Sequence, residues 1–457
     1  MDMMYIGASG ASAAQTQLNV TAQNTANAYT EGYTRQRAET SAVGPSWGNS
    51  SSAGNGVQVD SIVRVSDQCL VSQIWSASSD NGYYSTTQQY LGALESVLSS
   101  PDSSLSAGFD NFFAALNEAT TEPDSDSLRA QVISESNAFC LRLDNTDKYI
   151  DSQRSQAQDQ CQAAVEQVNT LTDGIADYNQ QIAETEANGG NASALYDARD
   201  QLTNELSSLV DVQVTVDDKG AYNVALPDGQ PLVSGDTSST LGLKTNEDGS
   251  QSLEMNFAGT TYDLDTSTGG TLGALFDYQD QILDPLDDAV NGIASAFATA
   301  VNDQLAQGYD LNGNPGKPLF VYDETDPDGP LTVNPDIDSD ELAFSSDPDA
   351  PANGDNLTAL IGLANEPIDI PDMGEMSVND ACSTIISQIG IASRQNQTEE
   401  TAASNVLYEA QSQQASVSGV NMDEEAVNLI TYTQSYQANL KVISTSAEIF
   451  DDVLQMF

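Results

Sequence analysis

Carboxylates make up most of the ionisable side chains in this sequence. Asp and Glu number 68 against 13 Lys and Arg, histidine is absent, and the formal charge is −55. Without histidine there is no Ser-His-Asp or Cys-His catalysis and no histidine-ligated zinc. Gly-rich phosphate loops of the GxxxxGKS/T or GxGxxG type do not occur. Carboxylate pairs can hydrolyse glycosides, but no pair is distinguished by its position. We therefore predict that the chain is not an enzyme and has no catalytic or cofactor-binding residues.

Two acidic segments could bind a hard cation such as calcium. DLNGNPG, at 310–316, begins like a calcium loop, but Pro315 stands where that loop needs Gly and Val321 where it needs a bidentate Glu. DIDSDE, at 336–341, could ligate a cation by proximity alone. Both lie in or near an acidic stretch, 323–355, that has no basic residue. We interpret it as a solvated acidic loop and predict no metal site.

The charge also limits the partners of the chain. It excludes a nucleic-acid binder, which needs cations against phosphate, and disfavours anionic membrane surfaces. Three explanations of the acidity remain: a shell that repels acidic substrates, a calcium-binding protein, or a surface adapted to high salt. We favour the surface adapted to high salt, because the carboxylates are scattered over the whole length of the chain. No apolar run approaches the ~18 residues of a membrane span, so we expect no membrane insertion. No basic residue precedes Arg35, so we expect no cleaved secretion signal; the chain is either cytoplasmic or exported by another route.

The four cysteines show no CxxC motif and no metal-ligand spacing. Cys140 and Cys161 fall in one predicted helix, where 21 residues place them roughly 30 Å apart, beyond disulfide reach. We expect Cys69, Cys140, Cys161 and Cys382 to be small buried hydrophobes.

Hydrophobic periodicity divides the chain into helical and β regions. Helical patterns run from Asp67 to Leu98, where Pro101 follows as a stop signal, for about 60 residues from Asp126 or Ser127, and from Leu195 to Leu209. At Val210 the period changes to two, with DKG and PDG turns, and strands continue to about Leu264. Helical patterns return at 269–305 and from 377 to the end, with a loop around 418–420. The Gly/Ser-rich segment 44–56 is a predicted loop.

We therefore predict a mainly α fold with inserted β structure, built as an elongated multi-domain rod. The predicted domains are a terminal coiled coil (1–36 and 400–457), a helical bundle (37–210, 270–305 and 374–399), an inserted β domain (211–269) and an acidic loop or β excursion (306–373).

Both ends of the chain carry apolar or small residues at alternating spacings of three and four. This pattern is typical of a helix that buries a narrow stripe against a partner helix. The N-terminal stripe is small and includes Ala11, Ala14 and Leu18. No Gly or Pro ends the C-terminal helix, so we expect its partner to extend as far as the last residue. We predict that the two terminal helices pair as a coiled coil; the alternative is two unrelated surface helices.

Several motifs, in this order, resemble the flagellar axial proteins. GASAAQTQLNVTAQNTANAYTEGYTRQ resembles the family's N-terminal signature, and SGVNMDEEAVNLITYTQSYQANLKVISTSAEIFDDVL resembles its C-terminal signature. Rod, hook and hook-associated proteins share both signatures. Three further features resemble the hook-associated family of the hook–filament junction. They are Arg35, the segment that leads from the helices into the strands, IADYNQQIAETEANGGNASALYDARDQLTNELSSLVDVQV, and the following helix, which begins GGTLGALFDYQ. Gln304 lies near the place where that family usually has His, and Thr25 replaces an apolar residue.

The resemblance implies a structural adaptor subunit that joins hook to filament, outside the cell, after export without a cleaved signal. Its terminal helices would become ordered on assembly. The implied partners are the hook protein, a filament-side hook-associated protein, further copies in a ring-like layer, and an export chaperone that grips Ile443, Phe450 and Leu454. The alternatives are another axial protein (hook or distal rod) and a secreted acidic coiled-coil surface protein.

The resemblance and the two stripes together give the predicted subunit-interface residues. On the N-terminal segment they are Ala11, Ala14, Leu18, Asn24, Asn27, Gly32, Tyr33 and Arg35. On the C-terminal helix, which the chaperone would also bind, they are Tyr436, Asn439, Leu440, Ile443, Ala447, Phe450 and Leu454. Arg35, Arg37 and Arg64 are candidates for ion pairs, either across subunits or within the chain.

Overall fold

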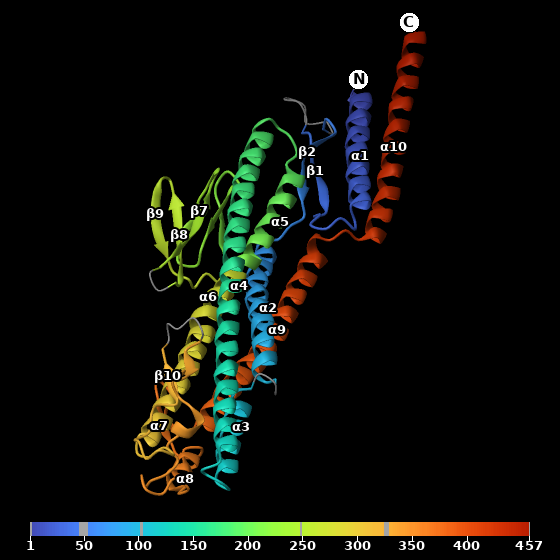
Figure 1. Cartoon of the computed structure of the whole chain (residues 1–457). Coiled ribbons are helices and arrows are strands. Elements are labelled where there is room, and N and C mark those ends of the chain that lie inside the picture. Colours follow the sequence, from blue (N-terminus) through green and yellow to red (C-terminus); the bar gives the residue numbers. More distant parts are fainter. Residues whose placement is uncertain (1, 45–53, 101–103, 247–248, 324–328, 457) are drawn as a thin grey trace. The chain divides into compact units, whose positions relative to one another are not determined.

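The computed structural model describes residues 2–44, 54–100, 104–246, 249–323 and 329–456. The chain divides into two compact units. Unit 1 contains Met1–Tyr83, Ala164–Thr271 and Ala402–Phe457, and unit 2 contains Tyr84–Ala163 and Leu272–Thr401. The fold is mainly α, with small antiparallel sheets inserted between long helices (Figure 1), as the periodicity predicts.

Unit 1 contains both terminal helices, a hairpin, one end of three long helices and the β insertion. Its helices and first hairpin are α1 (Asp2–Ala26), β1 (Gln36–Ala42), β2 (Val57–Arg64), the first part of α2 (Gln68–Leu98), the last part of α4 (Asp126–Ala187), α5 (Ser193–Leu209), the last part of α9 (Val378–Ser418) and α10 (Met422–Gln455). The predicted long helix is therefore confirmed, and α5 returns along it after a turn in which Gly189 has φ +71°.

The β insertion forms two antiparallel meanders. One has the order β3-β4-β5-β6 (Gln213–Val216, Tyr222–Ala225, Pro231–Ser234, Thr237–Ser238), and the other β7-β8-β9 (Thr240–Thr245, Gln251–Phe257, Thr260–Leu264). The change of period at Val210 marks the true boundary, because that residue already has extended dihedrals, φ −143° and ψ 146°. The DKG turn closes where Asp217 accepts hydrogen bonds from the amides of Lys219 and Ala221, and Gly220 takes φ +80°.

Unit 2 is built around a cluster of phenylalanine rings. Its elements are the last part of α2, α3 (Leu105–Ala119), the first part of α4, α6 (Gly270–Tyr278), a π turn (Gln279–Leu283), α7 (Asp284–Leu305), β10 (Phe320–Tyr322), β11 (Leu331–Val333), α8 (Asp355–Gly362), β12 (Ile368–Ile370), β13 (Gly374–Met376) and the first part of α9. The predicted helix ends at Leu98, but α3 was not predicted; it begins at the N-cap Ser104 and buries Phe109 and Phe112. Pro101, its predicted stop signal, lies outside the described residues.

The predicted helix at 269–305 contains a π turn. The amide of Asp284 donates to the carbonyl of Gln279, five residues back. Pro285 follows and has no N–H to donate, so the wider turn lies next to a hydrogen bond that the helix cannot make.

The segment 306–373 combines short strands with the helix α8 rather than forming a simple loop. Asp310 is buried, and its carboxylate accepts hydrogen bonds from the amides of Asn312 and Asn314. It therefore closes its own turn. Among the described residues no group of three or more His, Cys, Asp or Glu side chains is placed to hold a metal ion; residues 324–328 of the acidic stretch, and 45–53 of the Gly/Ser segment, lie outside the description.

The cysteines agree with the sequence-based prediction at three of the four positions. All four cysteines are free; Cys140, Cys161 and Cys382 are buried, as predicted, but Cys69 is exposed in the first turn of α2, so that prediction is wrong. The α-helical period there does not distinguish the inward from the outward face near a helix start.

Across the described ranges, no helix combines the length and the apolar content that crossing a membrane requires.

Asp147 on α4 should make unit 2 less stable as the pH rises. Burial, followed by the charges of Asp287, Asp151 and Asp144, raises its pKa from 3.8 to about 6. The folded state therefore holds this proton more tightly than the unfolded chain, and the free energy of unfolding falls between about pH 4 and pH 6. Because the side chain is only half-buried, we expect Asp147→Asn to stabilise the protein by only about 1 kcal/mol at pH 7.

Urea unfolding at pH 7 and at pH 4 measures this effect. The Asn variant should gain stability at pH 7 and gain little at pH 4, where the native carboxyl is already protonated. Asp159→Asn, at an exposed position of the same helix, controls for the loss of one negative charge. An equal gain for both variants at pH 7 would contradict the assignment to Asp147.

Candidate assembly surface

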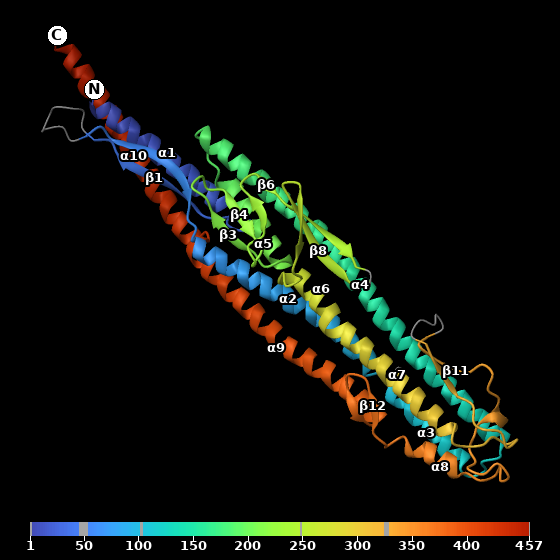
Figure 2. The same cartoon turned by 90° about the vertical axis from the view of Figure 1, so that its left-hand side faces the viewer.

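The terminal helices α1 and α10 lie side by side and antiparallel in unit 1 (Figures 1 and 2). Asn24 contacts Glu425, Gly10 faces Asn439, and Gly7 faces Asn439 and Ile443, so residue numbers fall along one helix as they rise along the other. A Cβ added at Gly10 would lie 2.4 Å from the side-chain oxygen of Asn439. The glycines therefore let the two backbones approach closely, and the predicted pairing of the termini is confirmed.

The hairpin β1–β2 packs on another side of α1. The amide of Val57 donates to the hydroxyl of Ser9, and Gly56, at φ +103°, brings its backbone against the same side chain. Ala13 and Val20 of α1 are buried. With α10 on one side and the hairpin on another, α1 buries its small residues within the chain.

α10 continues past the start of α1 (Figure 1). Extrapolating the pairing of Gly7 with Ile443 places Asp2, the first residue of α1, opposite Glu448, so Phe450 and Leu454 have no partner in α1. The expectation that the partner extends as far as the C-terminus is wrong: α1 is shorter than α10 and the two helices are offset. Phe450 is 58% exposed and Leu454 59%.

The predicted interface residues fall into three classes. Ala11, Ala14 and Asn24 are buried within the chain. Half-buried residues are Leu18, Asn27, Tyr33 and Arg35 on the N-terminal segment and Tyr436, Asn439 and Ile443 on α10. Exposed residues are Gly32, Leu440, Ala447, Phe450 and Leu454.

Further apolar side chains of α10 are exposed and were missed by the heptad reading. They are Val427, Ile430, Ile449 and Val453. A single stripe at spacings of three and four describes one contact face. α10 is apolar on more than one face, and counting apolar residues around the whole helix would have revealed this.

Asn24 joins three segments of the chain. Its amide nitrogen donates to the carbonyl of Gln36 at 2.9 Å and to Oε1 of Glu425 at 3.1 Å, and its oxygen accepts from the amide of Gln36 and the hydroxyl of Tyr33. Burial, then the charges of Asp197 and Glu425, raise the pKa of Tyr33 to about 12, so this phenol remains a donor. Asn24 is 1% exposed and holds α1, β1 and α10 together.

Arg35 holds the break between α9 and α10. Its amide donates to the carbonyl of Ser418, the last residue of α9, and its guanidinium lies 2.8 Å from Glu424. Asn421 starts α10 by accepting hydrogen bonds from the amides of Asp423 and Glu424. The loop predicted around 418–420 is therefore confirmed as a break in the helix that Arg35 bridges.

Arg64 connects the hairpin to α5. It lies 2.8 Å from both Asp197 and Asp200, and Asp197 also accepts from the amide of Thr34. Burial alone would lower the pKa of Arg64, but Asp200 and Asp197 outweigh it and the pKa is raised. Arg35, Arg37 and Arg64 were candidates for ion pairs either across subunits or within the chain. The structure shows pairing within the chain for all three, since Arg37 also pairs with Glu39.

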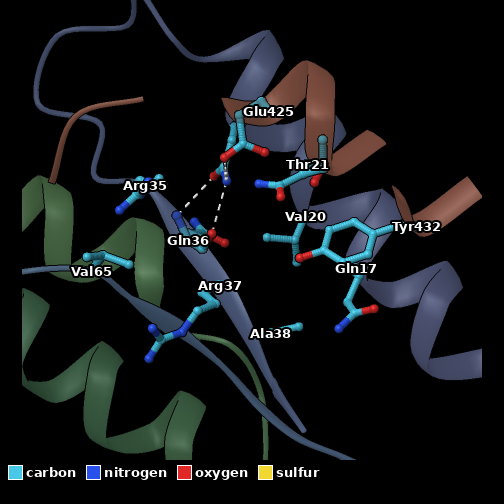
Figure 3. A pocket seen from close by; sticks show the side chains of 12 residues that line it. Gln17, Val20, Thr21, Arg35, Gln36, Arg37, Ala38, Val65, Glu425 and Tyr432 are labelled. Atoms are coloured by element: carbon cyan, nitrogen blue, oxygen red, sulfur yellow. Dashed lines mark hydrogen bonds between the residues drawn. The ribbon is translucent and has the colours of Figure 1, made fainter. Parts of the chain in front are cut away.

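A cavity of about 260 Å³ lies where α1, β1 and α10 meet (Figure 3). The lining side chains are mostly polar. They are Gln17, Val20, Thr21, Asn24, Arg35, Gln36, Arg37, Ala38, Val65, Glu425, Asn428 and Tyr432. Glu425 and Tyr432 reach it from α10, whereas Gln36 and Arg37 reach it from β1.

Family comparisons agree with this arrangement. The family model described as flagellar hook-associated protein FlgK helical domain matches residues 91–320, just over half of the chain. The terminal segments match two models shared more widely: flagella basal body rod protein at 4–34 and the C-terminal region of flagellar basal body rod FlgEFG proteins at 411–456.

Full-length relatives and a solved structure are also similar. The chain is 28% identical to flagellar hook-associated protein 1 of Escherichia coli, over 98% of each chain, and 28% identical to that of Bacillus subtilis, over 97% of this chain and 96% of the relative. The flagellar hook junction protein FlgK of Burkholderia pseudomallei has the same fold, with a TM-score of 0.67 at 18% identity over 76% of this chain and 100% of that one. Because the helical-domain model covers half of the sequence, the chain belongs to the FlgK family of flagellar hook-associated proteins.

Proposed function

We propose that the chain is a structural adaptor subunit that joins hook to filament through its terminal helices. The apolar face of α10 carries this proposal, since Leu440, Phe450 and Leu454 are exposed in the single chain. Side chains of this kind on a soluble surface mark a site that another protein covers. The covering proteins would be neighbouring copies in a ring-like layer, the hook protein on one side and a filament-side hook-associated protein on the other.

The middle of the chain favours a junction protein over another axial component. Hook and rod proteins share the terminal signatures, so 4–34 and 411–456 do not discriminate. The hook-associated helical domain at 91–320 does. The other axial proteins and the secreted surface protein remain alternatives that localisation would detect.

We infer that the terminal helices become ordered as they assemble and pass through the export channel beforehand as extended chain. The part of α10 beyond α1 has no partner that could offset its ordering entropy in a free subunit. The same segment would offer Ile443, Phe450 and Leu454 to an export chaperone, as an amphipathic helix in a groove. The chain would then lie outside the cell.

Assembly should depend on salt. Each copy carries a formal charge of −55, and the Debye length shortens from ~30 Å at 0.01 M to ~3 Å at 1 M salt. We expect incorporation onto purified hooks to rise roughly tenfold or more over that range, because screening removes repulsion between neighbouring copies. Labelled protein bound to sedimented hooks measures it, with sucrose as an uncharged control; equal incorporation at both salt concentrations would contradict the prediction.

A deletion strain tests the proposed function. Electron microscopy of the cells and an assay of flagellin in the medium should show intact hooks without filaments and flagellin lost to the medium. Normal filaments would remove the adaptor function and favour the surface-protein alternative. Loss of the hook itself would instead assign the chain to the rod or hook.

A further inference from the structure

Glu425 is a buried carboxylate with one free oxygen. The residue is 3% exposed, and Oε1 accepts the hydrogen bond from Asn24. Oε2 is fully buried and has no hydrogen-bond partner among the described residues. A buried acceptor without a donor is costly, and a buried charge without a partner more so. Glu425 also lines the cavity between α1, β1 and α10 (Figure 3).

The two cations that line this cavity are already engaged. Arg35 lies 2.8 Å from Glu424, and Arg37 lies 3.2 Å from Glu39. Apart from Glu425 itself, the remaining lining residues are neutral. The cavity therefore contains one carboxylate that no cation of its own chain pairs with in the described structure, and a positively charged donor from outside would complete it.

Lys441 is the cation of the terminal helices that could bind in this cavity. It is the only Lys or Arg in α1 and α10, and it is exposed. The positions three and four residues away on the helix carry no carboxylate. Lys441 thus lacks a partner on its own helix, as Glu425 lacks one in its cavity.

The two residues cannot meet within one chain. Sixteen residues of helix separate them by about 24 Å along the axis of α10 and by roughly 160° around it. A contact between them must therefore join two copies. Because donor and acceptor lie on opposite sides of the helix, the contact is head-to-tail and repeats from copy to copy, as in a ring or helical layer.

We propose that the cavity at Glu425 receives the Lys441 ammonium group of a neighbouring copy. The proposal rests on the proposed function, which requires copies to lie side by side, and it specifies one contact between them. In the assembled layer each copy gives Lys441 to one neighbour and accepts Lys441 from another. Both charges then become paired in a chain that otherwise repels its own copies.

Zero-length cross-linking tests the contact directly. Light and heavy isotope-labelled copies are mixed, incorporated onto purified hooks and treated with a carbodiimide, which joins a carboxylate to an amine only in direct contact. Mass spectrometry should detect Glu425–Lys441 links between light and heavy peptides, and Glu425→Gln should abolish them. Assembled layers without this link would overturn the proposal.

A double-mutant cycle provides the second measurement. Glu425→Gln retains an oxygen for Asn24, so the monomer should keep its melting temperature. Glu425→Gln and Lys441→Gln should each lower incorporation roughly tenfold or more, and the double variant should be no worse than either one. Lys219→Gln, exposed in the β insertion, controls for the change in net charge.

The outcomes separate the two proposals. Strictly additive losses in the double variant, or full incorporation of both single variants, would overturn the Glu425–Lys441 contact and leave the adaptor function intact. If the wild-type chain fails to incorporate onto hooks and to restore filaments in the deletion strain, the adaptor function itself fails.

Discussion

Unit 2 should lose about 3–5 kcal/mol of unfolding free energy when Phe297 is replaced by Ala. Phe297 is 1% exposed, and its ring centroid lies 4.8 Å from that of Phe109, 5.3 Å from Phe139 and 5.5 Å from Phe320. These rings come from α3, α4, α7 and β10. Removing the central ring leaves a cavity that several rigid elements cannot close together.

Urea unfolding followed by far-UV circular dichroism measures this loss, and hydrogen exchange assigns it to unit 2. Phe450→Ala is the matched control, because the same atoms are removed from a side chain that is largely exposed. The control should change the stability of the monomer by less than about 0.5 kcal/mol. If the two variants are equally stable, the phenylalanine cluster is not the core of unit 2.

Replacing Phe450 and Leu454 together by Ser should leave the monomer folded and nearly abolish assembly. Neither side chain packs against α1, so the fold loses little. If neighbouring subunits cover both, burying them contributes roughly 1.5–3 kcal/mol each. The double variant should then incorporate onto purified hooks at least about 100-fold less well than the wild type.

Sedimentation of labelled protein with hooks measures this incorporation, and the melting temperature of the free protein verifies its fold. Leu141→Ser provides a control, because Leu141 is a similarly exposed leucine on α4 in unit 2. It should incorporate normally. Wild-type incorporation of the Phe450 and Leu454 variant would show that the outer face of α10 is not an assembly surface.

Much of the fold could be predicted because its signals are local and repeat. The 3.6-residue period over 126–187 and the change to a period of two after Val210 each extend over many residues. α3 was missed because a proline near Leu98 ends one pattern and the next covers only 15 residues. The exposure of Cys69 depends on which side of α2 faces a partner, which periodicity at a helix end does not determine.

The joint at Asn24 could not be derived from local patterns. Its partner Glu425 is 401 residues away in sequence, and neither residue type predicts the other. The two signature segments of the family contain these residues, but the resemblance does not indicate that they touch. The overhang of α10 was missed for a related reason: two stripes predict that the helices pair, but the offset between them depends on where glycines such as Gly7 and Gly10 allow close approach.

The central claim is that α10 becomes an assembly contact at the hook–filament junction. An electron cryo-microscopy map of junctions containing this chain tests it most directly. The map should place α10 in contact with neighbouring subunits, with Leu440, Phe450 and Leu454 covered by their helices. A map in which these side chains face open solvent, or in which the chain is absent from the junction, would contradict the claim.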